Sequence, residues 1–373
     1  MNPKLWIPGP TEVRPEILAA SAAPMIGHRT AACRELVASV DPGLHLAFGT
    51  DEDSTSTVAV HTCSATGLME AALRGAGPRV LAIVGGAFAK RWAEIAERLG
   101  KTVVRLDVEW GRAVEPDALR ASLSEGSFDA VTLVVNETST GVRTPLSTVA
   151  EVMADFPDTQ LLCDVVSLLA GAPIDFDRHR IDFALAGVQK ALALPPGIAV
   201  CCVSERYLEG ARKANPGSYY LDPVTFIDGH VAQKTPSTPA LGLYFALRQQ
   251  LDDITNGATL PEAERHLSGA AAWQARFDKH LAMQARCVAW AATRGLALLP
   301  PSDEASPTVS CIRAGALDIA NLTAGLLERG LAISNGYGPL KGQTFRIGHM
   351  GDHTEEGLDE LLAAADVVLS GAR

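Results

Sequence analysis

The sequence of 373 residues lacks the features that would place it in a membrane or on a nucleic acid. It has no run of 18 apolar residues, the length that an α-helix needs to cross a bilayer. Its formal net charge is −11, so neither a nucleic acid nor an anionic membrane is expected as a general partner. No G-x-G-x-x-G motif follows the first predicted strand, which disfavours a dinucleotide-binding protein.

Cysteine patterns are also missing. The seven cysteines are odd in number and scattered, and no two of them form a C-x-x-C pair. Cys163, Cys201 and Cys202 lie in apolar runs, where cysteine behaves as a small core residue. We therefore expect neither a disulfide framework nor a metal site. Pro8 and Pro10 come too early for the apolar part of a secretory signal, and a reducing cytoplasm fits these features best.

What the sequence does have is an alternation of apolar runs and helical patterns, which is typical of an α/β fold. The runs are mostly continuous, as in the strands of a largely parallel sheet covered on both faces. The seven predicted strands are 58–62, 80–84, 102–106, 130–135, 161–166, 183–186 and 198–203. The predicted helices of this part are 33–48, 68–73, 88–99, 116–124 and 147–156.

Three parts are predicted: an N-terminal arm at 1–20, a large domain at 21–256 and a small C-terminal α+β domain at 257–373. The boundary is placed at the turn signal Asn256-Gly257. Proline and glycine predict irregular structure over residues 1–30 and a loop at 216–239. The later elements are predicted as helices at 240–254, 262–294, 317–329 and 354–369 and strands at 308–313, 331–334 and 345–348.

Lys190 is the first candidate for chemistry because it lies in an uncharged segment between two apolar runs. A lysine is costly to bury while charged, and desolvation lowers the pKa of its amine and favours the neutral, nucleophilic form. Such an amine can form a Schiff base with pyridoxal phosphate. The alternative is a lysine that reaches from a strand end to solvent.

Three polar features before Lys190 match the needs of the same cofactor. The turn Ser64-Ala65-Thr66-Gly67 opens a helix, whose N-terminal N–H groups favour a phosphate, although a plain helix cap is the alternative. Asp164 ends a strand, where it could pair with a pyridinium nitrogen or only cap the next turn. The loop 136–141 offers hydroxyls to a ring oxygen, or it is an ordinary βα turn.

Arg346 is the candidate in the C-terminal part. Its guanidinium could bind a substrate carboxylate through two parallel hydrogen bonds. The alternative is an arginine on the surface.

Taken together, the order of these features resembles the class V aminotransferase family of pyridoxal-phosphate fold type I. The likeness is greatest to the alanine–glyoxylate and serine–pyruvate (serine–glyoxylate) aminotransferases, and it covers nearly the whole chain. The matching segments are 8–11, 27–29, 67–73, 91–98, 137–142, 189–192 with 195–197, and 346–351.

The resemblance implies a role for each candidate. Lys190 is the Schiff-base lysine and proton carrier, and Asp164 pairs with the ring nitrogen. Arg346 binds the substrate carboxylate, helped by the backbone near Gly9. The remaining implied contacts to the cofactor are Ser64, Ala65, Thr66 and Gln189 at the phosphate, Ser139 with Thr138 at the ring oxygen, and Phe88 and Val166 on the ring faces.

The resemblance also implies a homodimer, in which Thr238 of the segment Thr235–Pro239 reaches the phosphate of the neighbouring subunit. Two positions depart from the family pattern. Residue 65 is Ala where the family usually has Gly, so its methyl group could crowd the phosphate. Residue 88 is Phe where some members carry Trp, which changes the stacking area.

The function implied is transfer of an amino group from alanine or serine to glyoxylate or pyruvate. The alternatives are a 2-aminoethylphosphonate–pyruvate transaminase or a lyase or desulfurase of the same class. A desulfurase needs a mobile cysteine, whereas Cys287 and Cys311 lie in a predicted helix and strand. A catalytically silent relative should lack Lys190 or Asp164, and both are present.

Overall fold

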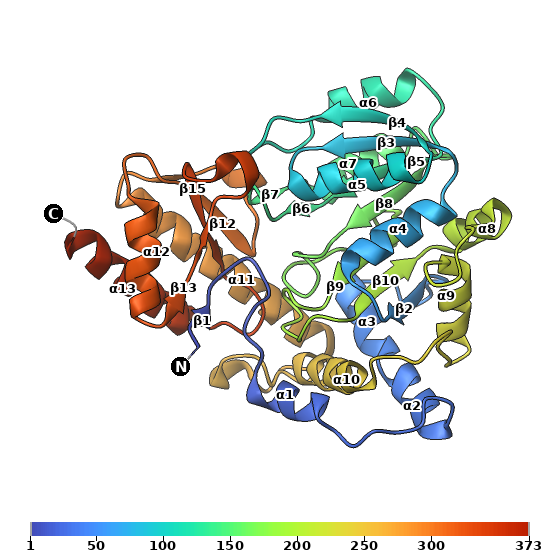
Figure 1. The fold of residues 1–373 in the computed structure, drawn as a ribbon, viewed down its shortest axis with the longest axis horizontal. Coiled ribbons are helices and arrows are strands. Elements are labelled where there is room, and N and C mark those ends of the chain that lie inside the picture. The colour runs from blue at the N-terminus through green and yellow to red at the C-terminus, as the bar shows by residue number, and fades with distance from the viewer. Residues whose placement is uncertain (1, 372–373) are drawn as a thin grey trace.

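The computed structural model describes residues 2–371, so residue 1 of the predicted arm and residues 372–373 of the predicted C-terminal domain lie outside it. A seven-stranded sheet forms its centre, with the strand order β2-β10-β9-β8-β5-β3-β4 (Figure 1). Only β10 runs antiparallel to its neighbours. The strands are β2 (Thr57–His61), β3 (Arg79–Val84), β4 (Thr102–Asp107), β5 (Ala130–Val134), β8 (Gln160–Asp164), β9 (Phe183–Gly187) and β10 (Ala199–Val203). The predicted α/β fold with a mostly parallel seven-stranded sheet is confirmed.

Helices cover both faces of this sheet, which explains why its strands are apolar without alternation. On one face, Trp92 and Tyr207 belong to a core formed with α4 (Ala65–Gly75), α5 (Ala87–Arg98), α8 (Glu205–Ala214) and α9 (Pro223–Val231). The core on the other face is larger. Part of α11 (Gly269–Ala292) contributes to it, and its other helices are α1 (Pro15–Ser21), α2 (Ala31–Ser39), α3 (Asp41–Phe48), α6 (Pro116–Ser124), α7 (Leu146–Met153) and α10 (Leu241–Thr255).

A second, four-stranded sheet of order β11-β12-β15-β14 lies in the C-terminal part of the chain. Its strands are antiparallel and comprise β11 (Ala297–Leu298), β12 (Val309–Arg313), β14 (Ser334–Asn335) and β15 (Thr344–Gly348). The helices around it are α11 (Gly269–Ala292), α12 (Ile319–Glu328) and α13 (Glu355–Gly371). No helix within residues 2–371 has the length and apolar character that a membrane span requires.

The prediction of an irregular arm over residues 1–30 is wrong in two places. Residues Lys4–Leu5 form β1, which pairs in parallel with β13 (Leu331–Ala332), and residues Pro15–Ser21 form α1. The N-terminus therefore lies against the C-terminal part of the chain (Figure 1). A two-residue strand whose partner lies more than three hundred residues away leaves no periodic pattern.

The segment 216–239 is likewise not a loop throughout, because it contains α9. Its start carries a helix signal that the Pro and Gly content obscured: Asp222 accepts a hydrogen bond from Val224 N–H, and Pro223 occupies the first turn.

Two long predicted helices are each interrupted. Pro42 divides 33–48 into α2 and α3, because proline cannot continue the hydrogen-bond ladder of α2.

The predicted helix 262–294 begins later than expected. Residues Glu262–Glu264 form a 3-10 turn, and α11 starts only at Gly269, whose φ of +57° breaks the path between the two. Along α11, Trp273 and Phe277 belong to the core of the large sheet, whereas Met283 and Cys287 belong to the core of the small one. One helix thus contributes to both cores, and the domain boundary near residue 256 stays a prediction.

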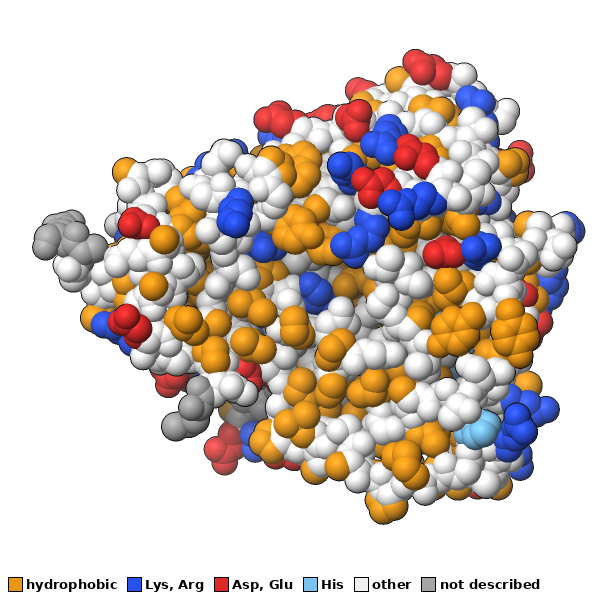
Figure 2. All heavy atoms as spheres, in the orientation of Figure 1, with side chains coloured by type: hydrophobic (Ala, Val, Ile, Leu, Met, Phe, Trp, Pro, Cys, Tyr) orange, Lys and Arg blue, Asp and Glu red, His pale blue; other side chains and the backbone are white. Residues whose placement is uncertain are grey.

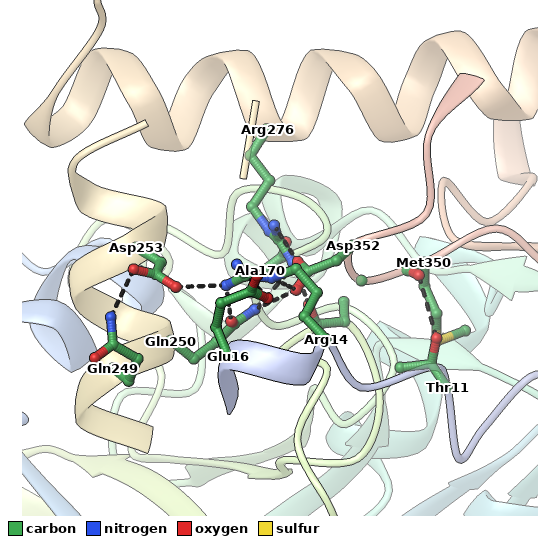
Figure 3. Close-up of polar contacts among 12 residues, drawn as sticks. Thr11, Arg14, Glu16, Ala170, Gln249, Gln250, Asp253, Arg276, Met350 and Asp352 are labelled. Atoms are coloured by element: carbon green, nitrogen blue, oxygen red, sulfur yellow. Dashed lines mark hydrogen bonds and ion pairs between the residues drawn. The ribbon is translucent and has the colours of Figure 1, made fainter. Parts of the chain in front are cut away.

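A buried cluster of charged side chains connects these parts (Figure 3). The Asp352 carboxylate lies 2.7 Å from Arg14 Nε and 2.9 Å from Arg276 Nη1. Arg14 also pairs with Asp253 of α10 at 2.6 Å. Burial alone would raise the pKa of Asp352, but the cations Arg276, Lys279 and Arg14 outweigh that effect and hold it at about 2. The cluster therefore joins the N-terminal arm, α10, α11 and the segment after β15.

Asp352→Asn should lower the free energy of unfolding by about 3–5 kcal/mol at neutral pH, because the buried Arg276 guanidinium loses its counter-charge and the half-buried Arg14 loses one of its two close carboxylate partners. The effect should be full above the ordinary aspartate pKa of 3.8 and should shrink as the pH falls toward 2, where the native carboxylate is protonated. Urea unfolding at several pH values measures this difference. Asp359→Asn, which breaks an exposed pair with Arg286, is the control and should cost at most about 1 kcal/mol. An equal cost for both variants would contradict the role of the cluster.

Candidate active site

A cavity of about 340 Å³ lies at the carboxyl ends of several strands of the large sheet, and its size is in the range of small-molecule sites. It brings together residues that are far apart in sequence. The wall is formed by Gly9, Pro10, Ser64, Ala65, Thr66, Met69, Phe88, Arg91, Val134, Asn136, Thr138, Asp164, Val166, Gln189, Lys190 and Pro196. Ten of the thirteen candidate residues from the sequence are in this wall; Ser139, Thr238 and Arg346 are not.

Lys190 follows β9 and is buried, with 9% of its surface exposed, so it does not extend to solvent. Its Nζ donates a hydrogen bond to the Pro8 carbonyl oxygen. Burial and, second, the positive charge of Arg346 lower the pKa of Lys190 to about 8. Near neutral pH a useful fraction of this amine is therefore uncharged and nucleophilic.

The N-terminal arm closes over Lys190 because residue 9 is glycine. A Cβ at Gly9 would lie 2.5 Å from Lys190 Cδ and 2.8 Å from its Nζ, and the φ of Gly9 is +102°. Both facts exclude a side chain at this position. The arm is held to the same segment by a bond from Thr11 N–H to the carbonyl of Gln189. Pro8, through its carbonyl oxygen, and Gly9, through its lack of a side chain, thus allow the arm to pack closely on Lys190.

Asp164 is the last residue of β8 and has 3% of its surface exposed. One carboxylate oxygen accepts a hydrogen bond from Val166 N–H at 2.8 Å, which is the only hydrogen bond it receives from residues 2–371. Burial raises the pKa of Asp164 to about 7. A buried carboxylate at a cavity wall without a cationic partner has capacity to bind one.

The turn at 64–67 forms the start of α4, as predicted from the sequence. The Ser64 hydroxyl makes no capping bond to this helix, so it does not act as an ordinary N-cap. Gln189 lies in the same cavity wall. Residues with hydroxyl groups, one with an amide and the positive end of an eleven-residue helix therefore belong to the wall of one cavity.

Of the two hydroxyl candidates in the loop 136–141, only Thr138 reaches the cavity wall. The Ser139 hydroxyl is instead donated to Glu137 Oε1 at 2.6 Å and also accepts Ala87 N–H. The Ser139 hydroxyl, named first from the resemblance, is thus engaged behind the cavity wall. Thr138 is the one of the two residues that lines the wall, and its hydroxyl donates to Ser167 Oγ at 3.0 Å. The sequence alone offered no means of telling which neighbouring hydroxyl faces inward.

Arg346 lies in β15, buried and next to the cavity. It donates Nε to the Asn335 carbonyl at 3.1 Å and Nη1 to the Thr138 carbonyl at 3.2 Å. Within residues 2–371 it forms no ion pair with a carboxylate, so the surface alternative does not describe it. Thr238 is exposed in an irregular segment between α9 and α10 and does not line the cavity of its own chain.

Comparison with known proteins identifies the family of the chain. The family model described as aminotransferase class V matches residues 59–252. An uncharacterized aminotransferase of Methanocaldococcus jannaschii is 34% identical over 98% of this chain and 92% of its own length. The chain belongs to the class V aminotransferase family. It is therefore an aminotransferase, and its family is dependent on pyridoxal phosphate.

Two further relatives of this aminotransferase have named activities. The serine–glyoxylate aminotransferase of Methylorubrum extorquens is 30% identical to this chain. The match spans 98% of this chain and 90% of that protein. The solved structure of the alanine–glyoxylate aminotransferase of Nostoc superposes with a TM-score of 0.88 at 27% identity, over 99% of this chain and 96% of that one.

Glu137 is a site residue of this aminotransferase that sequence reasoning did not single out. Its buried carboxylate accepts hydrogen bonds from the N–H groups of Phe88 and Ala89, both at 3.1 Å. Glu137, which lies in the two-residue strand β6 (Asn136–Glu137) after β5, therefore caps the N-terminus of α5. The residue before α5, Gly86, has no side chain that could do this, and a Cβ there would lie 2.4 Å from Glu137 Cγ. Glu137 thus fixes where Phe88 enters the cavity.

Asn136 is a second such residue. Its Nδ2 donates to Ser167 Oγ at 2.8 Å and to Thr308 Oγ1 at 3.1 Å. Both hydroxyls donate their own protons to backbone carbonyl oxygens, so they can only accept a hydrogen bond from Asn136. The amide orientation is thereby fixed, and its buried Oδ1 has no partner in the described part of the chain.

Glu137→Ala should lower the free energy of unfolding by about 2–4 kcal/mol, because it leaves buried N–H groups at the start of α5 unpaired. Thermal or urea unfolding measures this loss. Glu94→Gln removes an exposed carboxylate from the same helix and should change stability by less than about 0.5 kcal/mol. If Glu137→Ala is as stable as Glu94→Gln, Glu137 does not cap α5.

Proposed function

We propose that this aminotransferase uses pyridoxal phosphate bound through Lys190 to move an amino group from alanine or serine to glyoxylate or pyruvate. The observation that carries the proposal is the meeting of a buried lysine, a buried aspartate and a helix N-terminus in one cavity. When bound, the cofactor supplies an aldehyde that takes up the amino group and a ring that acts as an electron sink.

The residues present fit this cofactor at each of its ends. The unpaired Asp164 carboxylate suits a protonated ring nitrogen, and the hydroxyls of Ser64 and Thr66 with the start of α4 suit a phosphate. Phe88 and Val166 offer apolar contact to the ring faces. The other proposed contacts are Ala65 and Gln189 at the phosphate and Thr138, in preference to Ser139, at the ring oxygen.

The chain's own residues then divide the work. Lys190, with a pKa of about 8, would take the proton from Cα of the amino donor in the first half-reaction. It would deliver a proton to Cα of the newly formed amino acid in the second. Asp164 keeps the ring nitrogen protonated. Arg346 receives the substrate carboxylate with the N–H groups of Nη1 and Nη2 that its bonds to the Asn335 and Thr138 carbonyls leave free, and the backbone at Gly9 assists. This orients the Cα–H bond for proton transfer.

A homodimer is part of the proposal. Large apolar side chains are exposed at Leu18, Met25, Tyr219 and Tyr220, and Figure 2 shows hydrophobic side chains gathered over one part of the molecular surface. Extended apolar patches of this kind mark interfaces. Thr238, exposed and outside its own cavity, is proposed to reach the phosphate of the second subunit. A cytoplasmic location remains part of the same proposal.

The alternatives are a 2-aminoethylphosphonate–pyruvate transaminase and a lyase or desulfurase of the same family. The buried positions of Cys287 in α11 and Cys311 in β12 do not favour a desulfurase, which needs a mobile thiol. The deciding experiment is a panel of half-reactions with alanine, serine, glycine, aspartate and 2-aminoethylphosphonate. Fastest turnover of alanine or serine supports the proposal, and fastest turnover of the phosphonate overturns it.

Lys190→Ala should lose the visible absorbance of the bound cofactor and essentially all turnover. Borohydride treatment of the wild-type enzyme, followed by peptide mass spectrometry, should place the cofactor on Lys190. Attachment to another lysine would show that the assignment is wrong. Lys279→Ala is not a suitable control, because Lys279 belongs to the buried charge cluster; the exposed Lys90→Ala is the matched one.

Asp164→Asn should still bind the cofactor but lose most of the half-reaction rate, because a neutral amide does not stabilise a positive ring nitrogen. Stopped-flow spectroscopy with the preferred donor measures the rate. A near-normal rate in a variant that retains the cofactor would remove Asp164 from the proposed mechanism.

Arg346→Lys should lower kcat/KM for amino and oxo acids by roughly 10²-fold, about 3 kcal/mol, since a lysine cannot form the two-point contact. The cofactor spectrum and the melting temperature should change little. If stability falls while kcat/KM per folded molecule is kept, Arg346 only holds the two parts of the chain together through Thr138.

A further inference from the structure

Arg91 of α5 is a charged side chain in the cavity wall to which neither the sequence nor the proposed function gives a role. Its Nη1 donates to Thr66 Oγ1 at 3.0 Å, and its guanidinium lies 4.9 Å from the centre of the Phe88 ring. The carboxylates near it on α4 and α5 are engaged elsewhere, since Glu70 pairs with Arg74 and Glu94 with Lys90. Within residues 2–371, Arg91 thus has no counter-ion.

The charged residues of the cavity wall indicate that Arg91 could balance the charge of a phosphate. The wall holds two cations, Lys190 and Arg91, and one anion, Asp164. Lys190 is proposed to bond to the aldehyde carbon of the cofactor, so its nitrogen is not available as a counter-ion for the phosphate. A phosphate dianion at the start of α4 would otherwise face only neutral donors and a partial helix charge. Arg91 lies beside that helix start, at Thr66.

The direction of the hydrogen bond to Thr66 carries a second consequence. A guanidinium can only donate, so the Thr66 oxygen accepts, and the hydroxyl proton is left for another partner. No acceptor for it exists in the described part of the chain, and Thr66 lines the cavity. Arg91 therefore makes the Thr66 hydroxyl a donor toward the cavity, which is what a phosphate oxygen requires.

We propose that Arg91 is a phosphate-binding residue of the cofactor site, which supplies positive charge and orients the Thr66 hydroxyl as a donor. This inference rests on the proposed use of pyridoxal phosphate. The competing role is structural: Arg91 could serve only to hold α4 against α5 and to support the Phe88 ring. The two roles differ in whether the effect of Arg91 depends on the phosphate group.

The test compares cofactor binding with and without the phosphate. Dissociation constants of pyridoxal phosphate and of pyridoxal are measured by equilibrium titration of the cofactor-free wild type, Arg91→Gln and Arg91→Lys. Arg91→Gln should weaken pyridoxal phosphate roughly 10- to 100-fold and pyridoxal by less than about 3-fold. Arg91→Lys should lie between, because it keeps the charge and loses the planar fork. Inorganic phosphate should compete less well in Arg91→Gln.

Lys90→Gln is the matched control, since it removes the neighbouring cation of the same helix, which is exposed and outside the cavity. It should bind both compounds like the wild type. Thr66→Val should weaken pyridoxal phosphate in the wild type and by a smaller factor in the Arg91→Gln background, because the hydroxyl acts through Arg91.

Equal loss of pyridoxal and pyridoxal phosphate in Arg91→Gln would assign Arg91 the structural role and overturn the inference. Unchanged binding of both would overturn it as well. These outcomes are distinct from failure of the proposed function, in which the wild type itself does not bind pyridoxal phosphate.

Discussion

The Asp352 carboxylate, buried between the guanidinium groups of Arg14 and Arg276, is the interaction on which the arrangement of the site depends. Arg276 extends this cluster toward the cavity, because its Nη2 donates to the Ala191 carbonyl at 2.7 Å and its Nε to the Ala170 carbonyl at 3.1 Å. The residue after Lys190 is thus fixed by a side chain of α11. Since a charge left alone in such a place is strongly unfavourable, the arm, α10, α11 and the segment after β15 must meet in one way.

Around the cavity, burial sets the chemistry of the ionisable groups in opposite directions. It lowers the pKa of Lys190 to about 8 and raises that of Asp164 to about 7, so that both lie near neutrality. The Arg346 charge acts on Lys190 in the same direction as burial, and Lys190 opposes the rise at Asp164. Ionisable groups with pKa values shifted toward neutrality in one cavity are typical of a site that transfers protons.

Much of the fold could be predicted from the sequence, because strands covered on both faces are continuous apolar runs that need no partner to be recognised. Lys190 and Asp164 could be identified in the same way, since a charged residue at the end of such a run is unusual. α9 was missed although Asp222 and Pro223 give a regular helix start. Glu137 and Arg91 gave no signal, because their partners, the start of α5 and Thr66, are brought to them only by folding.

By itself the sequence determined the seven strands and the turn at the start of α4, and it singled out Lys190 and Asp164 as candidates for chemistry. Only the tertiary structure decided that Thr138 lines the cavity while Ser139 does not, and that the N-terminal arm covers Lys190. Local patterns depend on apolar burial and on propensity, which act over a few residues. Hydrogen-bond direction and close packing, as between Gly9 and Lys190, depend on atoms brought together from distant parts of the chain.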